Sequence, residues 1–67
     1  MMKISIPKLS VAMVNAGIDS SKRLAEVAGV SANTISRLRN GGSAKLTTLR
    51  RLAEALGVSP SDIVEGG

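Results

Sequence analysis

The residues best suited to chemistry lie in one short stretch, Val27–Gly42, which reads VAGVSANTISRLRNGG. This stretch carries the guanidinium groups of Arg37 and Arg39 and the side-chain amides of Asn33 and Asn40. An arginine can donate two parallel hydrogen bonds to a phosphate or to guanine O6 and N7, and asparagine pairs in a similar bidentate way with adenine. These side chains therefore suit recognition of a nucleic acid better than bond-making chemistry.

Groups for catalysis or metal binding are scarce in the rest of the chain. The 67 residues include no Cys and no His, so the commonest metal ligand, the commonest general base and a thiolate nucleophile are all missing. The five carboxylates form no evident pair. The spacing of Ser5 and Lys8 matches that of some acyl-enzyme hydrolases, but no partner motif accompanies it, and we interpret it as chance. We predict a protein that is not an enzyme and needs no metal and no cofactor.

Composition indicates a small, basic, single-domain protein. Nine Lys and Arg residues against five Asp and Glu residues give a net charge of +4 and a pI near 10.4, which favours an anionic partner. The absence of aromatic residues removes the stacking platforms of single-strand binders and leaves an aliphatic core, which suits packed helices. No apolar run approaches the ~20 residues of a membrane span, and the start, MMKISIPK, lacks the apolar region of a secretory signal. We expect a cytoplasmic, nucleoid-associated protein without membrane contact.

Glycines and capping residues divide the chain into five short helices, so the predicted fold class is all-α. The expected helices span residues 7–16, 21–28, 32–39, 48–56 and 60–64. Their predicted N-caps, from the second helix on, are one of Asp19, Ser20 and Ser21, then Ser31, Thr47 and Ser59. Residues 1–6, with the alternating KISI, are expected to form a strand or an arm, residues 7–64 the domain, and residues 65–67 a flexible tail.

The helices predicted at 21–28 and 32–39 are separated by only three residues, which forces a steep crossing. Gly29 can adopt the left-handed conformation that such a turn needs. Ile35 and Leu38 would anchor the second of these helices to the core and leave its opposite face in solvent. We predict that this face, near the helix N-terminus, contacts bases in the DNA major groove through Ala32, Asn33, Ser36 and Arg37.

The segments LAEVAGVSANTISRLRNG and TLRRLAEALGVSPSDIV make residues 7–64 resemble the helix-turn-helix family of phage lambda repressor and Cro, also called the xenobiotic-response-element type. The resemblance implies a compact five-helix domain with its third helix in the major groove. It also implies phosphate contacts from Ser21, Asn40, Ser43 and Lys45. To these we add three neighbouring polar residues as predicted phosphate contacts: Lys22, Thr34 and Arg39.

Three features depart from the family's usual pattern. Ser21 stands where relatives usually carry Gln, and the stretch before Leu24 is one residue longer than usual, so Ser20 is an alternative phosphate contact. Many relatives pair a Glu at the position of Arg39 with an Arg at the position of Met13. We interpret the change as a lost ion pair that leaves an additional cation near the DNA.

These observations favour a sequence-specific regulator of double-stranded DNA, most simply a repressor that acts as a homodimer on a pseudo-palindromic operator. The alternatives are an antitoxin-like or other protein-interaction module on the same fold, and a helical domain that has lost DNA binding. The candidate dimer surface comprises Val11, Val14, Val27 and Val64. The KISI segment is a further candidate, either as a strand shared between subunits or as an arm along the DNA.

Overall fold

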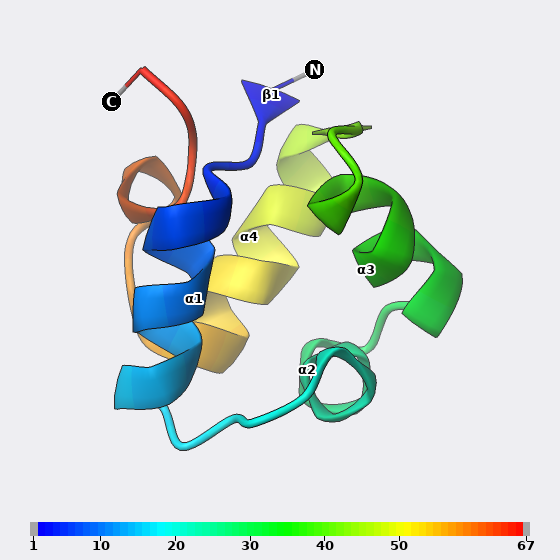
Figure 1. Cartoon of the computed structure of the whole chain (residues 1–67), viewed down its shortest axis with the longest axis vertical. Helices are drawn as coiled ribbons and strands as arrows, with labels where there is room; N and C mark the ends of the chain where they lie inside the picture. The colour runs from blue at the N-terminus through cyan, green and yellow to red at the C-terminus, as the bar shows by residue number, and fades with distance from the viewer. Residues whose placement is uncertain (1, 67) are drawn as a thin grey trace.

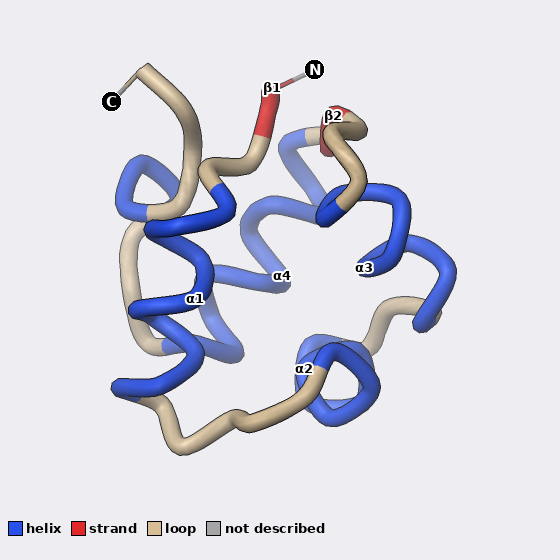
Figure 2. The backbone as a smooth tube through the Cα atoms, viewed as in Figure 1, coloured by secondary structure: helices blue, strands red, loops and turns tan. Residues whose placement is uncertain are grey.

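The computed structural model describes residues 2–66, which form four α-helices, one 3₁₀ turn and a two-stranded sheet (Figures 1 and 2). The elements are β1 (Met2–Lys3), α1 (Ile6–Asn15), α2 (Ser21–Ala28), α3 (Ala32–Arg39), β2 (Ser43–Ala44), α4 (Leu46–Leu56) and the 3₁₀ turn η1 (Pro60–Asp62).

Helix α4 lies between α1 on one side and the α2–α3 pair on the other (Figure 1). Four of its apolar residues recur at the spacing of one helical face and are buried: Leu49, Leu52, Ala53 and Leu56. Every buried side chain among the described residues is apolar, and all but the thioether of Met13 are aliphatic. The largest side chains that are almost fully buried are Leu9, Leu24, Ile35, Leu49, Leu52 and Ile63. Over the same residues, no helix has the length and apolar character needed to cross a bilayer.

Helices α2 and α3 have the predicted bounds, whereas α1 and α4 begin earlier than predicted. The N-cap of α1 is Ser5, whose hydroxyl accepts a hydrogen bond from the Lys8 backbone N–H at 3.4 Å. The predicted N-cap of α4, Thr47, is wrong, since this helix begins at Leu46 with Lys45 as its N-cap. Lys45 follows β2 directly and is still extended, so the chain enters the helix as soon as it leaves the strand.

The prediction of a fifth α-helix at 60–64 is wrong, because this segment forms only the 3₁₀ turn η1. The expected pairing of Ser59 and Asp62 is present, with the Ser59 N–H donating to the Asp62 carboxylate at 3.0 Å. After η1, Ile63 is fully buried and Val64 forms a β-bridge with Ile4. These tertiary contacts draw the chain out of helical geometry after a single turn.

Only the start of the KISI segment is a strand, because β1 ends at Lys3, Ser5 caps α1 and Ile6 begins that helix. Strand β1 pairs antiparallel with β2, with Met2 opposite Ala44 and Lys3 opposite Ser43. Ile4, which follows β1, is only 5% exposed and belongs to the hydrophobic core. The segment expected to be an arm thus packs against the domain from residue 2 onward.

The other side of β1 is occupied by the C-terminal segment. Ile4 bridges Val64, and the Glu65 N–H donates to the Lys3 carbonyl at 2.9 Å. The prediction that Val64 belongs to a dimer surface is wrong, since this side chain is 4% exposed and packs in the core. Within the segment predicted to be a flexible tail, Glu65 is thus hydrogen-bonded to β1. Residues 1 and 67 lie outside the described residues.

Candidate nucleic-acid interface

The turn between α2 and α3 has the geometry that its sequence predicts. Gly29 ends α2 in the left-handed conformation, with φ of 72° and ψ of 31°. The Val30 N–H then donates to the Ala25 carbonyl at 3.0 Å, and Ser31 caps α3 by accepting from the Thr34 N–H at 3.1 Å. Figure 1 shows α2 end-on while α3 runs across the view, so the two helices cross steeply. This arrangement is a helix-turn-helix.

Helix α3 is anchored on one side and exposed on the other. Ile35 and Leu38 are 1% and 3% exposed, and they fix the inner face of the helix against the core. The predicted base-contacting residues are all exposed on the remaining surface: Ala32, Asn33, Ser36 and Arg37. The structure therefore brings this set together on a single short helix.

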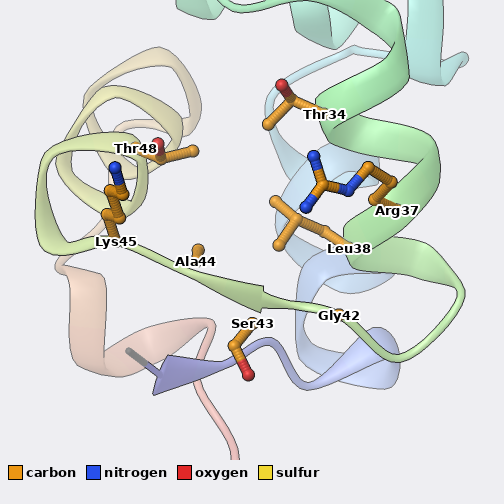
Figure 3. A pocket seen from close by; sticks show the side chains of 8 residues that line it. All are labelled: Thr34, Arg37, Leu38, Gly42, Ser43, Ala44, Lys45 and Thr48. Carbon is orange, nitrogen blue, oxygen red and sulfur yellow. The ribbon is translucent and has the colours of Figure 1, made fainter.

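A groove with a cavity of about 240 Å³ separates α3 from the start of α4 (Figure 3). Arg37 projects from α3 toward this space, and Lys45 and Thr48 line it from the first turn of α4. Thr34 lines it on the α3 side, although its hydroxyl is also hydrogen-bonded to that of Ser31 at 2.8 Å. Two cationic side chains and two hydroxyls thus surround an open groove, which suits an anion.

The loop that leaves α3 is pressed closely against the end of that helix. Asn40 is the C-cap, as predicted, and the Gly42 N–H donates to the Arg37 carbonyl at 2.9 Å. A Cβ on Gly42 would lie 2.7 Å from the same carbonyl oxygen, so only glycine fits without a shift. Ser43, predicted as a phosphate contact, is exposed and is one of the residues that line the groove, and its side chain lies on the opposite side of β2 from Ala44 (Figure 3).

The start of α2 contains a contact that was not predicted. Of the three candidate N-caps, Ser20 has this role, because its hydroxyl accepts from the Arg23 N–H at 3.1 Å. Ser21 is the first helical residue, and its hydroxyl accepts from Arg39 Nη1 at 3.1 Å. The same nitrogen lies 3.9 Å from Met13 Sδ. Arg39, expected as an additional cation facing DNA, therefore has partners within the protein.

Arg51 is a second residue whose role sequence reasoning missed. No contact was predicted for it from the sequence, but Arg51 Nη1 donates to the Gly29 carbonyl at 3.3 Å. The last carbonyls of a helix lack partners within that helix, so a nearby cation can satisfy them. This rule could have predicted that a cation binds the carbonyls at the end of α2, but the sequence does not show which cation reaches this turn.

The other predicted phosphate contacts lie near these two regions. Lys22 is exposed beside Ser21 at the start of α2, and Asn40 and Lys45 are exposed at the two ends of the loop between α3 and α4. Across residues 2–66, no three carboxylates come close enough together to hold a metal ion.

Residues 8–65 match the family model of the Cro/C1-type HTH DNA-binding domain. This match spans both helices of the helix-turn-helix, the groove and η1. Comparison with curated proteins gave no significant match, and neither did comparison with solved structures.

Proposed function

The chain belongs to the family of Cro/C1-type helix-turn-helix DNA-binding domains, and from that premise we propose that it is a sequence-specific transcriptional repressor. The observation that carries the proposal is the exposed polar face of α3, in a helix whose opposite face is fixed in the core. An α-helix with its side chains is about 10–12 Å across, which matches the roughly 12 Å width of the DNA major groove.

We assign base reading to four side chains on α3. Asn33 pairs with adenine, and Arg37 donates to guanine O6 and N7. Ser36 bonds a base edge of either kind, and Ala32 packs against a thymine methyl group. These contacts supply sequence discrimination, whereas phosphate contacts set the orientation of the protein on the duplex.

The proposed phosphate contacts flank α3 on both sides. They comprise Ser21 and Lys22 at the start of α2, and Thr34, Asn40, Ser43 and Lys45 from α3 to the start of α4. The groove supports Thr34, Ser43 and Lys45 as contacts, because these three residues line it and its cations and hydroxyls match the charge and acceptor oxygens of a phosphate. Arg39, predicted from the sequence as a further phosphate contact, instead has partners within the protein.

A homodimer is the proposed working form. The Cα atoms extend over 25 × 22 × 19 Å, which is less than the roughly 34 Å between successive major-groove sites on one side of DNA. One copy therefore covers one half-site, and two copies read a pseudo-palindrome. The exposed valines at positions 11, 14 and 27 remain candidates for the dimer surface. Occupation of an operator by this dimer, at the nucleoid in the cytoplasm, would block polymerase.

Selection of binding sites from a random duplex pool, at low and at moderate salt, tests this function. The proposal predicts enrichment of a two-fold symmetric site that persists at moderate salt. Binding without enrichment, lost as salt rises, would show phosphate attraction alone and overturn it.

A protein-interaction module is the second candidate function, favoured by the exposure of Val11 and Val14 on α1, at 61% and 77%.

The Arg37→Ala variant separates a DNA-reading protein from a helical domain that has lost DNA binding. Under the proposed function this variant loses affinity for the selected duplex, and unchanged DNA affinity would contradict base reading by α3.

A further inference from the structure

We propose that Arg39 is a positioning residue, which fixes α3 against α1 and α2, and that it does not contact a DNA phosphate. The inference rests on the proposed function. Arg39 Nη1 donates to Ser21 Oγ at 3.1 Å and lies 3.9 Å from Met13 Sδ. One guanidinium at the end of α3 thus touches the first residue of α2 and a side chain of α1.

Helix α3 has two buried side chains, Ile35 and Leu38, which lie within one helical turn of each other. They hold its inner face against the core and thereby set its orientation. A hydrogen bond from the last helical residue to a neighbouring helix adds a third fixed point. Bidentate base contacts depend on that orientation, since their geometry is narrow.

The geometry argues against a phosphate role for this arginine. The Arg39 side chain is exposed, but its guanidinium is directed back toward the protein, where Nη1 donates to the Ser21 hydroxyl and lies near the sulfur of the buried Met13. If both side chains turned to a phosphate, the bond between them would be lost. Lys45 differs in this respect, because it lines the open groove beside α3.

The first test needs no DNA and measures the contact itself. The thermal midpoints of Arg39→Gln, Ser21→Ala and the double variant form a double-mutant cycle. We expect each single variant to lower the midpoint and the double variant to lower it by less than the sum. Additive effects would overturn the contact. Because this test is independent of DNA, failure of the proposed function leaves its result interpretable.

The second test asks whether the contact acts on DNA reading, using the duplex from the selection experiment and a scrambled duplex. For Arg39→Gln we expect about fivefold weaker binding to the selected duplex, from the loss of one charge-assisted hydrogen bond. We expect unchanged binding to the scrambled duplex and an unchanged slope of log affinity against log salt. Loss of a phosphate contact would instead weaken both complexes and reduce the slope by about 0.9. That pattern would overturn the proposal.

Two variants calibrate the slope measurement. Lys45→Gln is the positive control, for which the slope should fall by about 0.9. Arg50→Gln removes an exposed arginine on α4 that has no proposed contact, and it controls for the loss of one unit of net charge.

Exchange of the charges gives a rescue experiment. The Arg39→Glu variant alone should bind the selected duplex poorly. The double variant Arg39→Glu with Met13→Arg should recover an affinity within about threefold of that of the original chain, because an ion pair between positions 39 and 13 replaces the lost contact. A double variant that folds, by circular dichroism, yet binds as weakly as Arg39→Glu would contradict the positioning role. If the buried position 13 does not accept arginine, the salt slope of Arg39→Gln decides the question alone.

Discussion

Arg37 and Arg39 stand two residues apart on α3 and have different surroundings. Arg37 projects toward the groove near Lys45, whereas Arg39 is hydrogen-bonded to Ser21 beside the α1 sulfur of Met13. Both were expected to contact DNA, one at a base and one at a phosphate. At the scale of single residues, the function of an arginine in this chain is determined by which neighbour its guanidinium can reach.

Replacement of Arg37 by alanine tests base reading. A bidentate contact with guanine contributes about 1–3 kcal/mol of discrimination, so we expect the affinity for the selected duplex to fall by roughly 5- to 150-fold. Preference at one base pair should relax in a repeated site selection. Equal weakening for every sequence would instead assign Arg37 to a phosphate.

Removal of the hydroxyl of Ser31 tests the capping of α3. This hydroxyl accepts from the Thr34 N–H and is also bonded to the Thr34 hydroxyl. Loss of an N-cap costs about 0.5–2 kcal/mol, so Ser31→Ala should lower the free energy of unfolding by that amount in urea titrations. Ser10→Ala, on α1 and remote from any cap, serves as the control and should change stability by less than about 0.5 kcal/mol. A Ser31→Ala variant as stable as this control would show that the cap is unimportant.

Among the secondary-structure elements, those defined by local signals were predicted well. Helices α2 and α3 have the predicted bounds because Ser31 and Gly29 act through bonds to residues only a few positions away. The start of α4 and the shortness of η1 were not predicted, since both depend on strand contacts made by Lys3, Ile4 and their partners. The contact between Arg39 and Ser21 spans 18 residues, and its geometry is set only when three helices dock.

Substitution of Gly42 tests the close approach of the loop to α3. A Cβ at this position would lie 2.7 Å from the Arg37 carbonyl oxygen, and the neighbouring atoms are backbone, which cannot rotate away. We expect Gly42→Ala to lower the free energy of unfolding by about 1–3 kcal/mol, as overpacking does. Ser43→Ala in the same loop is the control, with an effect below about 0.5 kcal/mol. Equal stability of the two variants would show that the loop is not held against the helix.

On the scale of the whole molecule, the two ends of the chain stabilise the fold together. Strand β1 lies between β2 and the segment around Val64, so the N-terminal residues connect the loop after α3 to the C-terminal segment. A domain of this size buries only about 60% of its unfolded surface, and each buried side chain matters accordingly. The aliphatic composition predicted the nature of the core but not that Ile4 belongs to it.

Truncation of Ile4 tests this role of the N-terminal segment. Replacement of a buried isoleucine by alanine lowers the free energy of unfolding by about 2–5 kcal/mol, and Ile4 is buried. This is a large share of the about 5–15 kcal/mol by which a small domain is typically stable. We expect Ile4→Ala to lower the midpoint of urea unfolding strongly. Val14→Ala, at a position 77% exposed, should leave that midpoint nearly unchanged. A mild effect of Ile4→Ala would contradict the integration of this segment into the core.

The central claim is that the exposed face of α3 reads a DNA sequence. The most direct test is the affinity for the selected duplex relative to a scrambled duplex of the same length, measured at about 150 mM salt. We expect a ratio of roughly 10³ or more, as specific DNA-binding proteins show. Equal affinities that fall together as salt rises would contradict the claim, because they would leave only the attraction of a +4 chain to phosphates.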